Sequence, residues 1–126
     1  MKTASDPRHI SRIKTMQALF AYDFGAHKKK KDASVANITK HLKKIDLLIT
    51  KSAPAFPVDK IAKVDLAILR LAVYELVIVK KAPPKVIIDE AVELAKEFGG
   101  DSASAFVNGV LGTVLKDWKE DGNKSN

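Results

Sequence analysis

One segment of the sequence is apolar almost all the way round a helix, and it constrains the fold more than any other feature. Between Val64 and Val79 the only charged residues are Asp65, Arg70 and Glu75. Their five-residue spacing scatters them around a helix instead of collecting them on one face. The β-branched residues near its end leave a strand open there, but the length favours a helix. We therefore predict a central, buried helix against which the other elements pack.

Amphipathic helices are expected on both sides of this segment, because apolar residues recur there at three- and four-residue steps. Asp6-Pro7 is typical of a helix start and Gly25 of a helix end, since Asp caps free amides and Gly adopts a left-handed conformation without steric cost. The predicted helices cover 7–24, one stretch from 35 to before Pro54, 85–98 and about 102–118, with a short turn of helix at 58–62. The predicted fold class is all-α, a compact helical bundle.

The length and composition indicate one globular domain. A chain of 126 residues can bury a core but is too short for two domains of ordinary size. We expect a single domain over 1–126, with flexible ends at 1–6 and 119–126. The absence of cysteine excludes disulfides and thiolate metal sites and favours the cytoplasm. Neither a secretory signal nor an apolar run of about 20 residues, the length of a membrane span, is visible.

The positive charge is concentrated in the first half of the chain. Residues 1–63 hold 14 Lys and Arg against 5 Asp and Glu, whereas residues 64–126 hold 8 against 10. The first half therefore carries +9 and the second half −2, which together give the net charge of +7. Such a basic half is typical of a protein that binds a polyanion such as RNA, although a solubilising surface is the alternative.

Motifs for catalysis or cofactor binding are not found. The sequence has no glycine-rich loop for a nucleotide phosphate. The three histidines, His9, His27 and His41, are too widely spaced for a metal-binding motif, and the neighbours Asp89 and Glu90 would point about 100° apart on a helix. We expect no cofactor, no metal and no enzymatic activity.

The first helix is a candidate RNA surface. Its two opposite faces are formed by Arg8, Arg12, Thr15, Leu19 and Tyr22 on one side and by Ile10, Ile13, Phe20 and Phe24 on the other. Arginine binds phosphate and aromatic rings stack on unpaired bases, so the first face suits RNA. Alternatively Leu19 and Tyr22 pack under another helix. Gln17 falls on the second face, which we expect to point to the core. Its amide could therefore equally be a hydrogen-bonded group of the interior.

Small residues on the final helix suggest a close approach to its backbone. Ala105, Asn108, Gly109 and Gly112 lie on one side, opposite an apolar side that includes Phe106. Because glycine inside a helix costs about 1 kcal/mol relative to alanine, two of them indicate a neighbour that needs the space. A packed helix is the more common neighbour, and a ligand is the alternative.

Four blocks of the sequence, in the right order, resemble the NusB family of bacterial transcription antitermination proteins. The central block from Val64 to Leu76 reads VDLAILRLAVYEL, and the block from Pro84 to Gly99 contains DEAVELAK. The block from Phe106 to Gly112 reads FVNGVLG. Residues 8–20 carry the arginines and the QALF run of the family's first helix.

This resemblance implies a fold of two small helical bundles and a cytoplasmic, non-enzymatic protein that supports transcription of ribosomal RNA operons. It implies binding to single-stranded boxA-type leader RNA together with the ribosomal protein NusE, in a complex with NusA, NusG and RNA polymerase. The implied RNA-binding residues are Arg8, His9, Arg12, Gln17, Phe20, Phe106 and Asn108. The implied NusE-binding residues are Asp65 and Glu75.

The chain also departs from the family pattern. The segment between Phe24 and Ser34 is short and carries the lysine run 28–31, so five to seven helices are expected. One alternative function is a protein-interaction adaptor with little RNA binding of its own, and a homodimer is a further option. In that adaptor an exposed acidic face would recruit a basic partner through Asp89, Glu90, Glu93 and Glu97. A methyltransferase domain is not expected, since the chain ends at Asn126.

Overall fold

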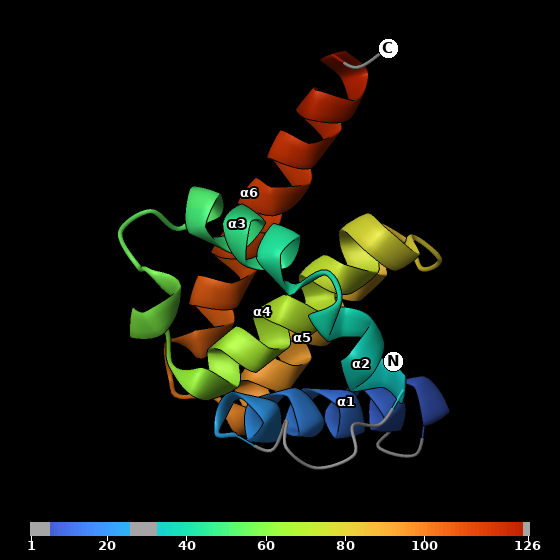
Figure 1. Ribbon diagram of the computed structural model, residues 1–126, viewed down its shortest axis with the longest axis vertical. Coiled ribbons are helices and arrows are strands. Elements are labelled where there is room, and N and C mark those ends of the chain that lie inside the picture. Colours follow the sequence, from blue (N-terminus) through green and yellow to red (C-terminus); the bar gives the residue numbers. More distant parts are fainter. Residues whose placement is uncertain (1–5, 26–32, 125–126) are drawn as a thin grey trace.

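The protein is an all-α bundle, as predicted. The computed structural model describes residues 6–25 and 33–124, which form six α-helices (Figure 1). The α-helices are α1 (Pro7–Asp23), α2 (Ala33–Thr39), α3 (Leu42–Ser52), α4 (Lys63–Tyr74), α5 (Pro84–Phe98) and α6 (Ala103–Lys124). A 3-10 turn η2 (Val58–Lys60) precedes α4, and a π-helical turn η3 (Glu75–Val79) follows it. The lysine run 28–31 lies outside the described residues.

Helix α4 is the central element. All residues from Leu66 to Val73 are buried, and α4 packs against α1, α3, α5 and α6. In Figure 1, α1 crosses below α4, whereas α3 and most of α6 lie on the opposite side. The prediction of a central buried helix is confirmed. Its last part continues as η3 and not as a strand, and it ends at Lys80, which has the left-handed φ of 58°.

Helix α1 packs on the core through the face that the sequence suggested for RNA. Thr15, Met16 and Leu19 are buried, whereas Phe24 is 65% exposed. The alternative in which Leu19 packs under another helix is therefore confirmed. The position of Gln17 on a core-facing side is wrong, because the residue is exposed. The predicted ends are confirmed: the Asp6 side chain accepts a hydrogen bond from the Arg8 amide at 2.9 Å, and Gly25 follows the helix with a φ of +96°.

The single helix expected from residue 35 to before Pro54 is wrong, since the chain breaks at Lys40 and His41. The amide of His41 donates to the Ile38 carbonyl, and the amide of Ile45 to the His41 carbonyl, at 3.0 Å each. The break lets two short helices reach different neighbours: α2 packs against α1 and α4, and α3 against α4 and α6. Tertiary packing thus overrides a continuous apolar period.

The last two helices complete the bundle. The predicted helix 85–98 is confirmed as α5, but α6 continues to Lys124, six residues beyond the predicted end at 118. The predicted acidic face of α5 is partly wrong. Asp89, Glu93 and Glu97 are exposed, whereas Glu90 is 3% exposed because it faces α1. None of the described helices is both long and apolar enough to span a membrane.

Candidate nucleic-acid interface

The start of α1 presents an exposed arginine. The Arg8 side chain is 82% exposed, and its only carboxylate neighbour in the described part of the chain is the helix cap Asp6, at 3.3 Å. The hydrogen bond from the Arg8 amide, followed by the one from its side chain, holds the pKa of Asp6 below its usual value. Because this ion pair lies in solvent, it contributes little stability and leaves Arg8 available for a phosphate.

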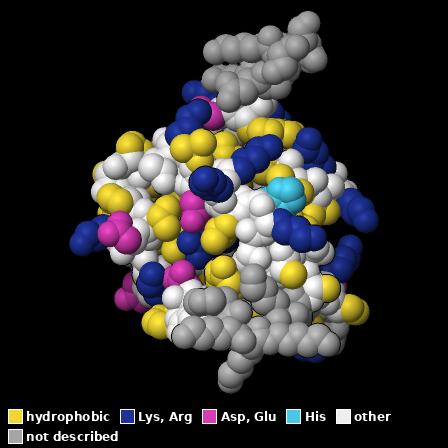
Figure 2. All heavy atoms as spheres, in the orientation of Figure 1, with side chains coloured by type: hydrophobic (Ala, Val, Ile, Leu, Met, Phe, Trp, Pro, Cys, Tyr) yellow, Lys and Arg dark blue, Asp and Glu magenta, His cyan; other side chains and the backbone are white. Residues whose placement is uncertain are grey.

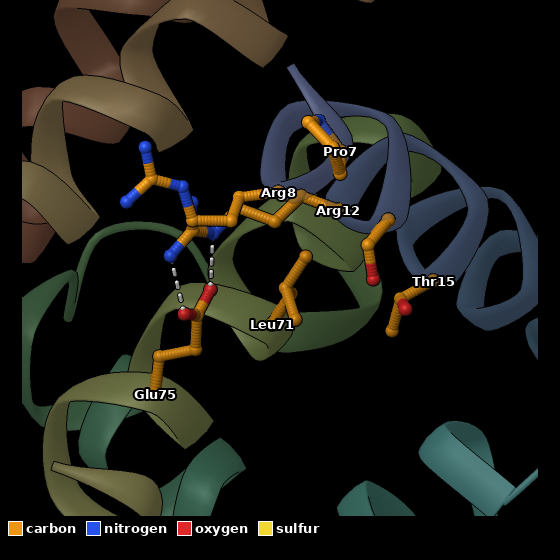
Figure 3. A pocket seen from close by; sticks show the side chains of 7 residues that line it. Pro7, Arg8, Arg12, Thr15, Leu71 and Glu75 are labelled. Atoms are coloured by element: carbon orange, nitrogen blue, oxygen red, sulfur yellow. Dashed lines mark hydrogen bonds and ion pairs between the residues drawn. The ribbon is translucent and has the colours of Figure 1, made fainter. Parts of the chain in front are cut away.

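Arg12, one turn later, is tied to the protein. Its Nε and Nη2 donate to the two carboxylate oxygens of Glu75 at 2.9 and 2.8 Å, and its Nη1 lies 3.4 Å from Glu90 (Figure 3). The Arg12 and Glu75 side chains are only 13% and 18% exposed. The two-pronged hydrogen bond to Glu75 raises the pKa of Arg12. Such a planar pair fixes the position of α1 relative to η3 and also stabilises the contact between them.

His9 lies beside two carboxylates of α5, those of Glu90 and Glu97. Its Nδ1 is 3.0 Å from Glu90 Oε2, and its Nε2 is 3.6 Å from Glu97 Oε2. The His9 side chain is 12% exposed. His9, Arg12, Glu75, Glu90 and Glu97 therefore form a charged seam that joins α1 to η3 and α5, and we call this group the α1 seam.

A groove opens next to this seam, between α1 and the α4–η3 segment. It has a volume of about 320 Å³, and Figure 3 shows the Arg12–Glu75 pair on one side and Thr15 on the other. The lining residues are Pro7, Arg8, Ser11, Arg12, Thr15, Leu71 and Glu75. A second groove of about 550 Å³ lies on the other side of α1, toward α2, and includes Lys14. The start of α1 is therefore a ridge between two grooves with exposed cations.

The C-terminal half of α1 lines a different cavity with Asp65. This cavity, of about 390 Å³, is bounded by Phe20, by the start of α4 and by the turn between α5 and α6. Burial raises the pKa of Asp65. Gly99 is required at this turn, because a Cβ there would lie 2.5 Å from the Ala103 Cβ and 2.7 Å from the Ala95 carbonyl oxygen.

The exposed small residues of α6 form a third region. Asn108, Gly109 and Gly112 are exposed, and no described residue lies within 4 Å of a Cβ added at either glycine. The expectation that a neighbouring helix packs on these glycines is therefore wrong. The ring of Phe106 meets that of Phe56 edge to face, with ring centroids 5.3 Å apart.

The structure thus distributes the predicted site residues, apart from the exposed Gln17, over three places. His9, Arg12 and Glu75 lie together in the α1 seam, where Arg12 and Glu75, predicted for different partners, bind each other. Arg8 is exposed beside the seam and lines the 320 Å³ groove. Phe20 lies with Asp65 in the 390 Å³ cavity, whereas Phe106 and Asn108 lie on α6. Sequence reasoning missed Phe56, which stands alone in a proline-bounded turn. Among the residues that the structure describes, no cluster of His, Asp or Glu is suited to hold a metal ion.

Sequence comparisons identify the chain's relatives. The model described as the NusB family matches residues 26–116. The transcription antitermination protein NusB of Herpetosiphon aurantiacus is 38% identical over 138 aligned positions, which cover 90% of this chain and 93% of that protein. The protein of the same name from Chloroflexus aggregans is 54% identical over 77 positions, and that match covers 60% of this chain and about half (51%) of the relative's length.

Comparisons with solved structures agree. A crystal structure of T. maritima NusB superposes with a TM-score of 0.78 at 31% identity, over 92% of this chain and 93% of that one. A crystal structure of the antitermination factors NusB and NusE in complex with dsRNA contains a chain that superposes with a TM-score of 0.74 at 27% identity. That match covers 87% of this chain and 96% of the other.

Proposed function

This chain belongs to the NusB family, and from that premise we propose that it acts in transcription antitermination by binding boxA-type leader RNA together with the ribosomal protein NusE. The family's antitermination role agrees with the prediction of a non-enzymatic protein. We place this activity in the cytoplasm, on RNA polymerase with NusA and NusG, in the transcription of ribosomal RNA operons. A NusB homologue bound to NusE and RNA supports the proposal.

The observation that carries the RNA part of the proposal is the exposed Arg8 guanidinium at the mouth of the 320 Å³ groove. Arg8 is free to neutralise a phosphate, whereas Arg12 and His9 hold the start of α1 in place through the α1 seam. Gln17 is exposed and available to a base edge or a phosphate. Phe20 lies at the opposite end of α1, next to Phe24.

The α6 region would contribute the contacts to bases. Asn108 has both a donor and an acceptor, and the two open glycines next to it let a strand approach the helix backbone. Phe106 lies on the neighbouring part of α6, where its half-buried ring is available to an unpaired base. Phosphates on α1 and bases on α6 would make the RNA site composite.

For NusE, Asp65 is the better placed of the two predicted residues. Asp65 and Glu75 are ten residues apart along the central helix, which corresponds to about 15 Å. Glu75 is engaged by Arg12, whereas Asp65 lines the 390 Å³ cavity and has no ion pair within the described residues. A basic or hydrogen-bond-donating side chain of NusE would offset the free-energy cost of burying part of the Asp65 carboxylate.

The proposal is tested by Arg8→Gln, with Lys85→Gln on the exposed end of α5 as the matched control. Binding of a single-stranded boxA-type RNA is measured across a salt titration, with and without NusE. We expect Arg8→Gln to weaken binding and to reduce the salt slope by about 0.7, the value for one phosphate contact on a single strand. Helix content should not change. An RNA affinity and salt slope equal to those of the control would refute the assignment.

A further inference from the structure

Helix α3 carries a lysine face that the proposed RNA site does not use. Lys43, Lys44 and Lys51 are exposed, and with the 60% exposed Leu47 they fall within about 100° of the helix circumference. Lys40, in the turn before α3, is exposed next to them. Figure 2 shows Lys and Arg side chains gathered on the side of the molecule where α3 lies in front in Figure 1.

Within the described residues, no carboxylate neutralises the positive charge of this face. None of these four lysines has a carboxylate within 4.0 Å in the described part of the chain. The only acidic residue of α3, Asp46, is 25% exposed and accepts hydrogen bonds from Arg70 Nε and Nη2 at 2.9 Å each. The one negative charge of the helix is therefore neutralised by the buried Arg70 of α4 and not by the lysines. The lysines are left to an outside anion.

The lysine face is continuous with the aromatic pair at α6. Helix α3 ends at Ser52, and the turn after it is closed by a hydrogen bond of 2.9 Å from the Phe56 amide to the Ala53 carbonyl. This turn keeps Phe56 next to the end of the helix, where its ring is 50% exposed and meets Phe106 edge to face. A half-exposed ring that packs on a partly buried one, at the end of a basic stripe, is an arrangement that single-stranded nucleic acids bind, with phosphates on lysines and bases on rings.

We propose that the RNA surface extends from Phe106 and Asn108 across Phe56 onto the lysine face of α3, where it binds the single-stranded RNA that flanks the boxA-type element. Lys44 and Lys51 are seven residues apart, so about 10 Å of this face can follow the strand. The contacts are to phosphates and to one stacked base, so this part of the surface does not select a sequence. This inference rests on the proposed function and adds the flanking RNA to it.

The test compares two RNAs. One is a boxA-type RNA of about 12 nucleotides, and the other is the same RNA lengthened by about 10 nucleotides at one end or the other. The first variant replaces Lys43, Lys44 and Lys51 by Gln, and its matched control replaces the exposed Lys81, Lys85 and Lys96, so that both lose three charges. The second variant is Phe56→Ala. All are measured as full-length chains by RNA binding over a salt titration.

We expect the α3 variant to bind the longer RNA about ten- to hundredfold more weakly and with a salt slope smaller by up to about 2. Phe56→Ala should lose about fivefold or more on the longer RNA, and the control variant should match the wild type. The short RNA should not distinguish the α3 variant from its control. Equal binding of the longer RNA by that variant and its control would overturn the proposal, as would a wild type that gains nothing from the added length.

Two further outcomes separate this proposal from the function on which it rests. If Arg8→Gln has no effect but the longer RNA still depends on α3, the proposed position of the boxA site fails and the lysine face remains. If the α3 variant binds RNA normally but loses polyglutamate, the face binds an acidic protein and the proposal is overturned. Circular dichroism of each variant excludes loss of the fold as the cause.

Discussion

Replacing Arg12 by Met should lower the free energy of unfolding much more than replacing the exposed Arg8. The substitution leaves Glu75 and Glu90 without their guanidinium, and these side chains are 18% and 4% exposed. Removing one partner of a fully buried ion pair costs about 3–5 kcal/mol. The value here should be about 2–4 kcal/mol, because the Arg12–Glu75 pair is partly exposed and His9 still lies 3.0 Å from Glu90.

The measurement is urea unfolding at neutral pH together with a thermal scan. For a chain of 126 residues, each kcal/mol corresponds to about 4 °C, so the melting temperature should fall by about 8–16 °C. The double variant Arg12→Met with Glu75→Gln should recover part of the loss, since the buried charge on Glu75 is then removed. The coupling between the two sites should be about 1–3 kcal/mol.

Arg8→Gln is the matched control for Arg12→Met, because both remove one arginine from the start of α1. Arg8 is 82% exposed, so its replacement should change stability by less than about 0.5 kcal/mol. A loss below about 0.5 kcal/mol for Arg12→Met, or a double variant no more stable than the single one, would show that the α1 seam does not stabilise the protein. Arg12 would then be free to serve RNA directly.

Two further predictions concern the carboxylate of Asp65 and the two glycines Gly99 and Gly109. Since burial raises the pKa of Asp65, the fold favours its protonated form, and the resulting stability is lost as the pH rises through the folded pKa. Asp65→Asn should therefore be more stable than the wild type at pH 7, by less than about 1 kcal/mol, in urea unfolding. This gain in stability should shrink as the pH falls to about 4. A variant that is less stable than the wild type at pH 7 would contradict the prediction. Gly99→Ala should destabilise the protein by about 1–3 kcal/mol, because the added Cβ would meet the backbone. Gly109→Ala, whose Cβ would lie in open space, should stabilise it by up to about 1 kcal/mol. Melting temperatures that shift in the same direction for both variants would contradict this prediction.

The elements that the sequence predicted are those whose signal is local. The apolar segment from Val64 to Val79 had to be largely buried whatever its neighbours, and its burial is confirmed from Leu66 to Val73. The break at Lys40 and His41 was missed because nothing in the apolar period marks it. The break is needed because α2 and α3 pack against different helices. Those contacts depend on the whole fold and cannot be seen in the local sequence.

The charged seam was missed for a related reason. Arg12 and Glu75 are 63 residues apart, and no local pattern connects them. The sequence did contain a signal for the burial of Glu90, which lies three residues after Ile87 and four before Leu94, both buried. Its charge suggested an exposed face, but its spacing places it beside the apolar stripe. A charged residue at such a position indicates a buried partner on another helix.

The α1 seam also determines what a salt titration of RNA binding measures. The start of α1 is held mainly by ion pairs, because the buried apolar residues of the helix, Met16 and Leu19, lie in its second half. If salt weakened the seam, α1 would detach and the titration would report that movement instead of phosphate contacts. Salt screens exposed charges strongly but mostly buried ones much less, and the Arg12 side chain is only 13% exposed. The seam therefore stays closed over the range in which Arg8 and the α3 lysines are screened, so the slope counts their phosphates.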